Sequence, residues 1–270
     1  MTSLQAITLG LVQGFSEFLP ISSSGHLVLT QAYFGLDHQT VAFDVFLHFA
    51  TLLAVILYFR TTLLHIKKKY ILSLIFATIP AVIVGLLFEE YITQAFSSVV
   101  FVGFGLLISG TFNLISGYKL NNTAVGTAKT VPDATPQTQE TQPTKTISHK
   151  QAVVVGLLQA FAILPGVSRS GSTVFAGIIQ NIDRKLAFEF SFLLSIPVIF
   201  GANILQVARI VGGQSFDIET MPLLLGGLCA FFAGLVSLKL LEIVITKAKI
   251  SYFGIYCIVV GLVTLFTSLS

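Results

Sequence analysis

Residues 13–26 read QGFSEFLPISSSGH, a run rich in polar side chains within a strongly apolar chain. The 270 residues are 54% hydrophobic, and their mean hydropathy is +0.88. Only 10% are charged, whereas soluble domains carry about 25%. This composition excludes a soluble globular protein and places most of the chain in a lipid bilayer.

Parts of this stretch and its surroundings return about 146 residues later, in the same order. The matching segments are GLVQGF (10–15) with GLLQAF (156–161), LPISSSG (19–25) with LPGVSRSG (164–171), and AFDVF (42–46) with AFEFS (187–191). The second turn carries one extra residue. Three matches at nearly one offset indicate two copies of one module.

Six apolar stretches are long enough to cross a bilayer, for which roughly 20 residues are needed and about 17 are the lower limit. They are residues 43–59, 71–88, 98–116, 187–208, 221–241 and 250–269. The two cysteines lie in apolar runs, so neither a disulfide framework nor a metal cluster is expected. A cleaved signal peptide is not expected either, because the N-terminus has no basic region.

Each copy begins with two apolar segments that are too short to span, joined by a turn of Pro, Ser and Gly. Residues 4–34 and 151–182 therefore predict two re-entrant helical hairpins, whose irregular backbone has to be buried in protein or face a wet cavity. We predict an all-α polytopic membrane protein with six transmembrane helices and two such hairpins. The first repeat is residues 1–116 and the second is residues 151–270, and a polar, largely disordered linker, 117–150, joins them.

The basic residues predict the orientation of the chain. Alternating the predicted spans places 13 of the 15 Lys and Arg residues on one side, which is the cytoplasmic side by the positive-inside rule. The linker is then cytoplasmic and both termini lie outside. The two hairpins enter from opposite sides, so the repeats are inverted, an arrangement that places a binding site near the midplane.

The hairpin turns carry the residues of an anion-binding site. A helix follows each turn, and its first amides lack intrahelical partners. Serine is a preferred cap of such ends, and two helix N-termini at a shared centre attract an anion. The candidate substrate-binding residues in and beside the turns are Ser22, Ser24, Gly25, Ser168, Ser170, Gly171 and Thr173.

Four further side chains add chemistry to this anion site. Arg169 supplies a planar fork suited to phosphate oxygens. His26 titrates near neutral pH, Glu17 is a carboxylate, and Gln13 lies one helical turn before it. An anion site combined with Glu, His and the hydroxyl of Ser23 indicates phosphoryl transfer to water.

The same residues also have structural interpretations, which do not involve phosphoryl transfer. Glu17 is also explained as a structural partner of Arg169, because ionisable groups at membrane depth pair with one another. The serines are also explained as helix caps, and His26 as a hydrogen-bonding group at a helix start. For Asp44 and Glu189 we expect structural roles, each bonding the backbone of the opposing hairpin, and for a nearby histidine of residues 43–59 we expect simple packing.

QGFSEFLPISSSGH and PGVSRSG resemble the two signature regions of the bacterial undecaprenyl-pyrophosphate phosphatases, also called bacitracin-resistance proteins. The resemblance covers nearly the whole chain except residues 121–148. It implies an inner-membrane hydrolase that removes the terminal phosphate of a polyprenyl diphosphate and so recycles the carrier lipid for peptidoglycan. It also implies a site open to the periplasm, membrane-lipid contact, a homodimer, and dependence on a divalent cation, Mg or Ca. No nucleic-acid partner is expected.

The resemblance assigns catalysis to Glu17, Ser23, His26 and Arg169, with Glu17 as a metal ligand as well, and it adds Gln13 to the substrate-binding residues. His26 is nucleophile or acid/base partner, and Ser23 is an alternative nucleophile or a phosphate contact. Many relatives have Glu where this chain has Gln13. Because a glutamine cannot act as a base, the acid/base role is expected of Glu17. The competing hypothesis is a transporter or flippase for an anion or lipid phosphate, because inverted repeats with broken helices are a transporter architecture.

Overall fold

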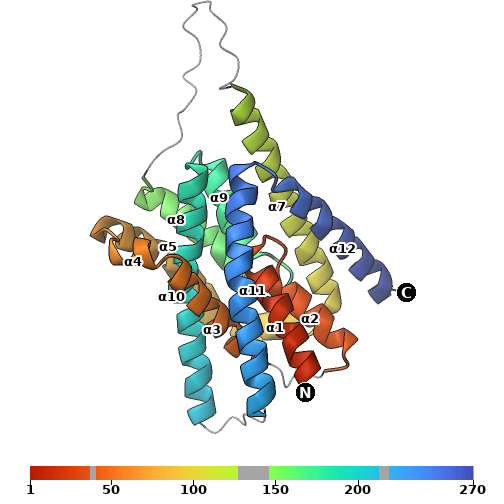
Figure 1. Cartoon of the computed structure of the whole chain (residues 1–270). Helices are drawn as coiled ribbons and strands as arrows, with labels where there is room; N and C mark the ends of the chain where they lie inside the picture. The colour runs from red at the N-terminus through yellow and green to blue at the C-terminus, as the bar shows by residue number, and fades with distance from the viewer. Residues whose placement is uncertain (37–40, 127–145, 213–218, 270) are drawn as a thin grey trace, which may run out of the picture.

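The computed structural model describes residues 1–36, 41–126, 146–212 and 219–269, and the regular elements in these ranges are all helices (Figure 1). In chain order they are α1 (Ser3–Phe18), α2 (Ser23–Tyr33), α3 (Val41–Tyr58), α4 (Arg60–Leu64), α5 (Lys68–Leu87), α6 (Glu89–Phe96), α7 (Val99–Gly126), α8 (His149–Phe161), α9 (Arg169–Ile179), α10 (Arg184–Val211), α11 (Thr220–Thr246) and α12 (Ser251–Leu269). The short helices α4 and α6 had no counterpart among the predicted elements.

Five described helices are long and apolar enough to cross a membrane, which confirms a polytopic membrane protein of the all-α class. They are Lys68–Leu87, Val99–Asn122, Arg184–Arg209, Thr220–Thr246 and Ser251–Ser268. The sixth predicted span, residues 43–59, coincides with a shorter apolar helix, Ala42–Tyr58.

The ends of the predicted linker are helical. Helix α7 continues past residue 116 to Gly126, and α8 begins at His149. Ser148 caps α8, because its side chain accepts a hydrogen bond from the amide of Gln151. Residues 127–145 of the linker lie outside the described residues.

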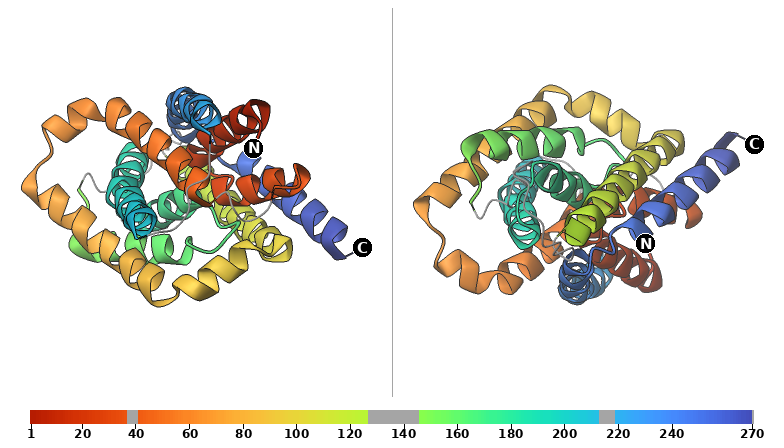
Figure 2. Two further views of the ribbon diagram at one scale, coloured as in Figure 1. Left: turned by 90° about the horizontal axis from the view of Figure 1, so that it is seen from below. Right: turned by 90° about the horizontal axis from the view of Figure 1, so that it is seen from above.

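Helices of the first half pack against helices of the second half in reciprocal pairs. Helix α1 packs along α11, and its repeat counterpart α8 packs along α5. Helices α7 and α12 pack on one another, as do α3 and α10. The views along the molecule show the chain from α3 to α6 as a wide arc around α10 (Figure 2). The two halves are therefore interlocked and share one packed interior.

Two glycines at equivalent repeat positions permit these contacts. A Cβ atom added to Gly10 of α1 would lie 2.2 Å from the carbonyl oxygen of Gly226 in α11. A Cβ atom added to Gly156 of α8 would lie 2.3 Å from the carbonyl oxygen of Ala77 in α5. Small residues let helix backbones approach closely inside membranes, so the repeated glycine explains why each copy docks its first helix on the other copy.

We expect Gly156→Ala to lower the free energy of unfolding by roughly 1–3 kcal/mol, because the methyl group would overlap the backbone of α5. Gly201→Ala in α10 is the matched control, since nothing lies within 4 Å of its added Cβ. The control gains helix propensity and is expected to be neutral or stabilised by up to about 1 kcal/mol. Thermal unfolding in detergent measures both, and equal midpoints for the two variants would contradict this packing.

Candidate active site

The two polar turns meet inside the helical bundle. The hydroxyl of Ser170, in the first turn of α9, donates a hydrogen bond of 3.4 Å to the carbonyl of Leu19, which ends α1. A Cβ atom on Gly25 of α2 would lie 3.2 Å from the Cα atom of Gly166. Residues separated by about half of the chain thus form one polar centre.

Each turn ends in a serine that caps the following helix. Ser22 precedes α2 and accepts a hydrogen bond of 3.3 Å from the amide of Gly25. Ser168 precedes α9 and accepts one of 3.1 Å from the amide of Gly171. The predicted equivalence of the two turns therefore extends to their capping hydrogen bonds. In both cases the N-terminus of a helix is directed at the centre.

Helix α7 holds both turns, through two polar residues that lie one helical turn apart. The Ser109 hydroxyl accepts a 2.7 Å hydrogen bond from the Ser168 amide and donates one of 2.9 Å to the Gly166 carbonyl. Asn113 donates a 2.6 Å hydrogen bond to the carbonyl of Pro20. Sequence analysis missed both residues. Polar side chains at i and i+4 in an apolar helix were the available signal.

Glu17 is the centre of the polar cluster, and it is only 5% exposed. Its Oε1 atom accepts a hydrogen bond from Arg169 of α9, which forms a buried ion pair between the two copies. Its Oε2 atom accepts one of 2.5 Å from the hydroxyl of Ser23 and one of 3.1 Å from Nε2 of Gln13. Three predicted residues, from α1, α2 and α9, thus donate to one carboxylate.

A histidine for which we expected simple packing belongs to this cluster. The Nε2 atom of His48 in α3 lies 3.5 Å from Oε2 of Glu17. Its Nδ1 atom lies 2.7 Å from the carbonyl of Asp44, one turn earlier, which fixes the ring orientation. The sequence feature that could have indicated its role was an ionisable side chain at membrane depth, because such residues are usually functional.

The structural roles expected for Asp44 and Glu189 also need correction. Asp44 accepts a 2.7 Å hydrogen bond from the side chain of Gln31, in the hairpin of its own copy rather than the opposing one. Glu189 lines a separate cavity with Lys67 and Tyr70. Asp44 and Glu189, at equivalent positions of the two copies, therefore have different contacts.

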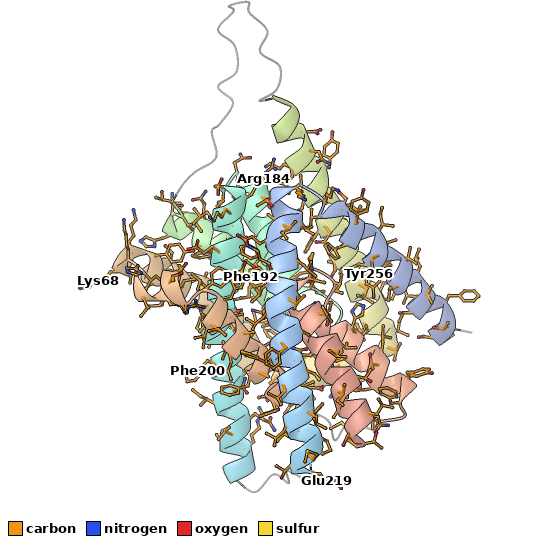
Figure 3. All side chains as sticks on the ribbon, viewed as in Figure 1. Lys68, Arg184, Phe192, Phe200, Glu219 and Tyr256 are labelled. Atoms are coloured by element: carbon orange, nitrogen blue, oxygen red, sulfur yellow. The ribbon has the colours of Figure 1, made fainter. Side chains whose placement is uncertain are left out.

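His26 makes contacts other than those of the Glu17 cluster. Its Nδ1 atom lies 2.8 Å from the carbonyl of Ser22, and its Nε2 atom lies 2.8 Å from the hydroxyl of Tyr256 in α12. The two rings stack, with centroids 5.6 Å apart (Tyr256 is labelled in Figure 3). In this conformation both ring nitrogens of His26 are engaged. The carbonyl that it holds belongs to Ser22, whose φ of 71° is unusual for a non-glycine residue.

The remaining predicted residues support the turns. Ser24 lies 3.3 Å from the Ser22 hydroxyl. Thr173 donates a 2.9 Å hydrogen bond to the carbonyl of Arg169 and also bonds Ser191 of α10. These contacts fix the first turn of α9, which carries the guanidinium.

The donor atoms at this centre suit a metal ion only in part. Within the described residues, no three His, Cys, Asp or Glu side chains gather into a possible metal site. One carboxylate is present, and beside it Oε1 of Gln13 is buried without a hydrogen-bond partner. Magnesium is commonly held by one or two carboxylates together with substrate phosphates, so these two side chains fit an ion that arrives with a phosphate group.

Comparison with known proteins identifies the family. Residues 6–263 match the family described as bacitracin resistance protein BacA. The undecaprenyl-diphosphatase of Halothermothrix orenii is 37% identical over 97% of this chain and 96% of its own length. That of Methanococcus vannielii is 37% identical over 97% and 99%, and undecaprenyl-diphosphatase 4 of Bacillus thuringiensis is 35% identical over 98% and 97%. With its two paired turns and a match over nearly its whole length, this chain belongs to the bacitracin resistance protein BacA family.

Proposed function

We infer that this protein is an undecaprenyl-diphosphatase, an integral membrane hydrolase. It cleaves undecaprenyl diphosphate into undecaprenyl phosphate and inorganic phosphate. This returns the carrier lipid to cell-wall synthesis and, as its family description says, confers resistance to bacitracin. The observation that carries the inference is the buried cluster of Glu17, Ser23 and Arg169 between two helix N-termini.

Binding of the diphosphate uses the parts of the site that favour negative charge. The guanidinium of Arg169 binds phosphate oxygens in a bidentate manner once the phosphate displaces the carboxylate of Glu17. The N-termini of α2 and α9 add their dipoles and hydroxyl groups. The charge that develops on the transferred phosphoryl group therefore meets groups that are already oriented.

The geometry favours Ser23 as the nucleophile. Its hydroxyl already donates to Glu17, so that Glu17 can take the proton while the serine oxygen attacks the terminal phosphorus. The bond from that phosphorus to the bridging oxygen breaks, and undecaprenyl phosphate leaves. Water, activated by the same carboxylate, then hydrolyses the phosphoserine and releases phosphate. The Nε2 atom of His48, 3.5 Å from Oε2 of Glu17, then accepts the proton that Glu17 took from Ser23, which frees the carboxylate to activate the water.

We assign His26 to the support of the turn rather than to attack, because both of its ring nitrogens are engaged. As nucleophile it would first have to leave Tyr256. By holding the carbonyl of Ser22 it keeps the N-terminus of α2 directed at the phosphate.

We propose that the divalent cation, Mg²⁺ or Ca²⁺, is held by Glu17 and Oε1 of Gln13 together with the phosphate oxygens of the substrate. When bound, the ion neutralises charge on the diphosphate. Loss of phosphate release after chelation, with recovery on adding either ion, tests this assignment.

We propose further that the chain forms two inverted repeats with re-entrant hairpins in the bacterial inner membrane. The linker is then cytoplasmic, and the termini and the site open to the periplasm. The reciprocal packing of the halves and the bias of basic residues support this topology. Labelling of Glu90→Cys but not of Lys150→Cys by an impermeant maleimide in whole cells tests it. The homodimer, which rests on the family resemblance, is tested by cross-linking in membranes.

We expect Glu17→Gln and Arg169→Lys to lower phosphate release from undecaprenyl diphosphate at least about 10²-fold. The first removes the base, and the second removes bidentate binding. The control is Glu90→Gln, an exposed carboxylate at the start of α6, which should keep the wild-type rate. The assay uses purified protein in detergent, where no gradient exists and a pure transporter would release nothing. Wild-type turnover in Glu17→Gln would refute the assignment.

A trapped phospho-enzyme should distinguish the nucleophiles. After rapid mixing with substrate labelled in its terminal phosphate and an acid quench, we expect acid-stable label on the protein that Ser23→Ala abolishes. Ser24→Ala, the matched neighbour, should retain the label. Acid-labile label that disappears in His26→Ala would assign attack to the imidazole instead. A rapidly turning-over enzyme with no label would indicate direct attack by water.

Asn113→Leu should lower kcat by up to about 10²-fold, because the first turn loses the side chain that fixes it and small displacements of reacting groups are costly. Ser116→Ala is the control, since this buried hydroxyl lies one turn further along α7 and has no hydrogen-bond partner. Steady-state kinetics and thermal unfolding together separate misplacement from unfolding. An unchanged kcat would show that α7 does not position the turn.

A further inference from the structure

A groove and a cavity adjoin along the seam between α5 and α10, away from the Glu17 cluster. The groove has a volume of about 410 Å³, and its lining is apolar apart from Thr78, whose hydroxyl donates to the carbonyl of Leu74. The lining includes Leu63 of α4, Ile71 and Ile75 of α5, and Leu193 and Ile196 of α10. A water molecule occupies about 30 Å³ in the liquid and a methylene group is of similar size, so the groove has room for one hydrocarbon chain.

The cavity has a volume of about 250 Å³, and several polar side chains line it together with the apolar Ile66. Thr62, His65 and Lys67, from α4 and the residues that follow it, line one part. Tyr70 of α5 and Glu189 of α10 line the rest. Hydrogen-bond donors, a cation and a carboxylate thus surround one small space.

The groove continues directly from the cavity. Leu63 follows Thr62 and Ile71 follows Tyr70, while Leu193 lies one helical turn beyond Glu189. Figure 3 shows α10 running from Arg184 near the top of the view, past Phe192, to Phe200 further down the helix. The cavity therefore lies toward the Arg184 end of the seam, and the apolar groove extends from it along the outer face of α5 and α10. This is the outline of an amphiphile with one chain in the groove.

The polar groups of the cavity are not satisfied by one another. The hydroxyl of Tyr70 is buried without a hydrogen-bond partner. Neither Lys67 nor Glu189 forms an ion pair within 4 Å in the described part of the chain, although Lys185, one turn earlier in α10, attracts the carboxylate of Glu189. The Nδ1 atom of His65 donates to the carbonyl of Thr61, so its Nε2 atom remains as a hydrogen-bond acceptor. The side chains of His65 and Lys67 are exposed. Buried polar groups ordinarily find partners, so it is the hydroxyl of Tyr70 that points to a ligand.

We propose that this site binds a phospholipid whose headgroup carries a phosphate and a primary ammonium, of the phosphatidylethanolamine type. The phosphate accepts hydrogen bonds from the ammonium of Lys67 and the hydroxyl of Thr62. The ammonium donates to the carboxylate of Glu189 and the hydroxyl of Tyr70. One acyl chain fills the groove along α5 and α10.

The carboxylate of Glu189 favours this lipid over one whose headgroup carries only negative charge. A headgroup that carries only phosphate, such as that of a polyprenyl phosphate or a phosphatidylglycerol, would bring negative charge against Glu189. A quaternary ammonium lacks the N–H groups that Glu189 and Tyr70 can accept. The pairing of Lys67 with Glu189 in one cavity therefore matches a zwitterion with N–H donors.

The absence of tryptophan from this chain allows a site-specific test. Ile75→Trp places a single reporter in the groove, and Ile255→Trp places one on α12, away from it. The two isoleucines are 51% and 55% exposed, so both substitutions fall on lipid-facing positions. Each full-length variant is reconstituted in phosphatidylcholine vesicles with increasing fractions of dibrominated phosphatidylethanolamine or phosphatidylglycerol, whose chains quench tryptophan on contact.

At the Ile75→Trp reporter, we expect half-quenching at about fivefold lower phosphatidylethanolamine than phosphatidylglycerol, the scale of one charge-assisted hydrogen bond. At the Ile255→Trp reporter, the two lipids should quench equally. Adding Glu189→Gln to the groove reporter should remove the preference. Adding Glu242→Gln, a carboxylate of α11 that already bonds Lys239, should leave it intact.

Equal quenching by both lipids at the groove reporter would overturn the proposal and make the groove ordinary lipid-facing surface. Stronger quenching by phosphatidylglycerol, or protection of the reporter by added undecaprenyl phosphate in preference to phosphatidylethanolamine, would overturn it in favour of an anionic occupant. Phosphate release is measured in parallel. Because the residues tested here lie outside the Glu17 cluster, failure of the lipid site leaves the enzymatic assignment unaffected.

Discussion

The buried ion pair between Glu17 and Arg169 is the contact on which the site depends. Each charge alone would be costly at this depth, since an unpaired ion in a low-dielectric interior loses its hydration without compensation. Paired, they connect a turn of the first half to a turn of the second half. The same pairing keeps the guanidinium in place for a phosphate, which offers oxygens of like charge in the same geometry.

Irregular backbone inside a membrane protein is stable only when its amides and carbonyls find partners. Here the capping serines supply some of these partners, and α7 supplies the others through Ser109 and Asn113. Because α7 packs on α12, which carries Tyr256, the same unit also holds His26. Other helices thus fix the turns, and the side chains of the Glu17 cluster are held in one arrangement.

The two copies of the module have diverged into different tasks. Arg169 stands in the second turn where Ser23 stands in the first, so that one composite centre receives the cation from one copy and the hydroxyl from the other. The equivalent carboxylates also differ. Asp44 bonds Gln31 beside the catalytic cluster, whereas Glu189 faces a cavity that continues into an apolar groove. A single interlocked scaffold therefore has room for the proposed reaction centre and, at a distance from it, for the proposed lipid site.

The sequence by itself determined the apolar helices, the two polar turns with their capping serines, and the membrane setting, because periodicity, composition and capping are local properties. It also indicated that Glu17 and Arg169 belong together, since isolated charges at such depth seek partners. Only the tertiary structure decided which imidazole lies beside Glu17. His48 occupies that place and His26 bonds Tyr256, because the rotation of each helix about its axis is set by packing against other helices. For the same reason the roles of Ser109 and Asn113 could not be predicted, because their hydrogen-bond partners lie 57 to 93 residues away in the chain.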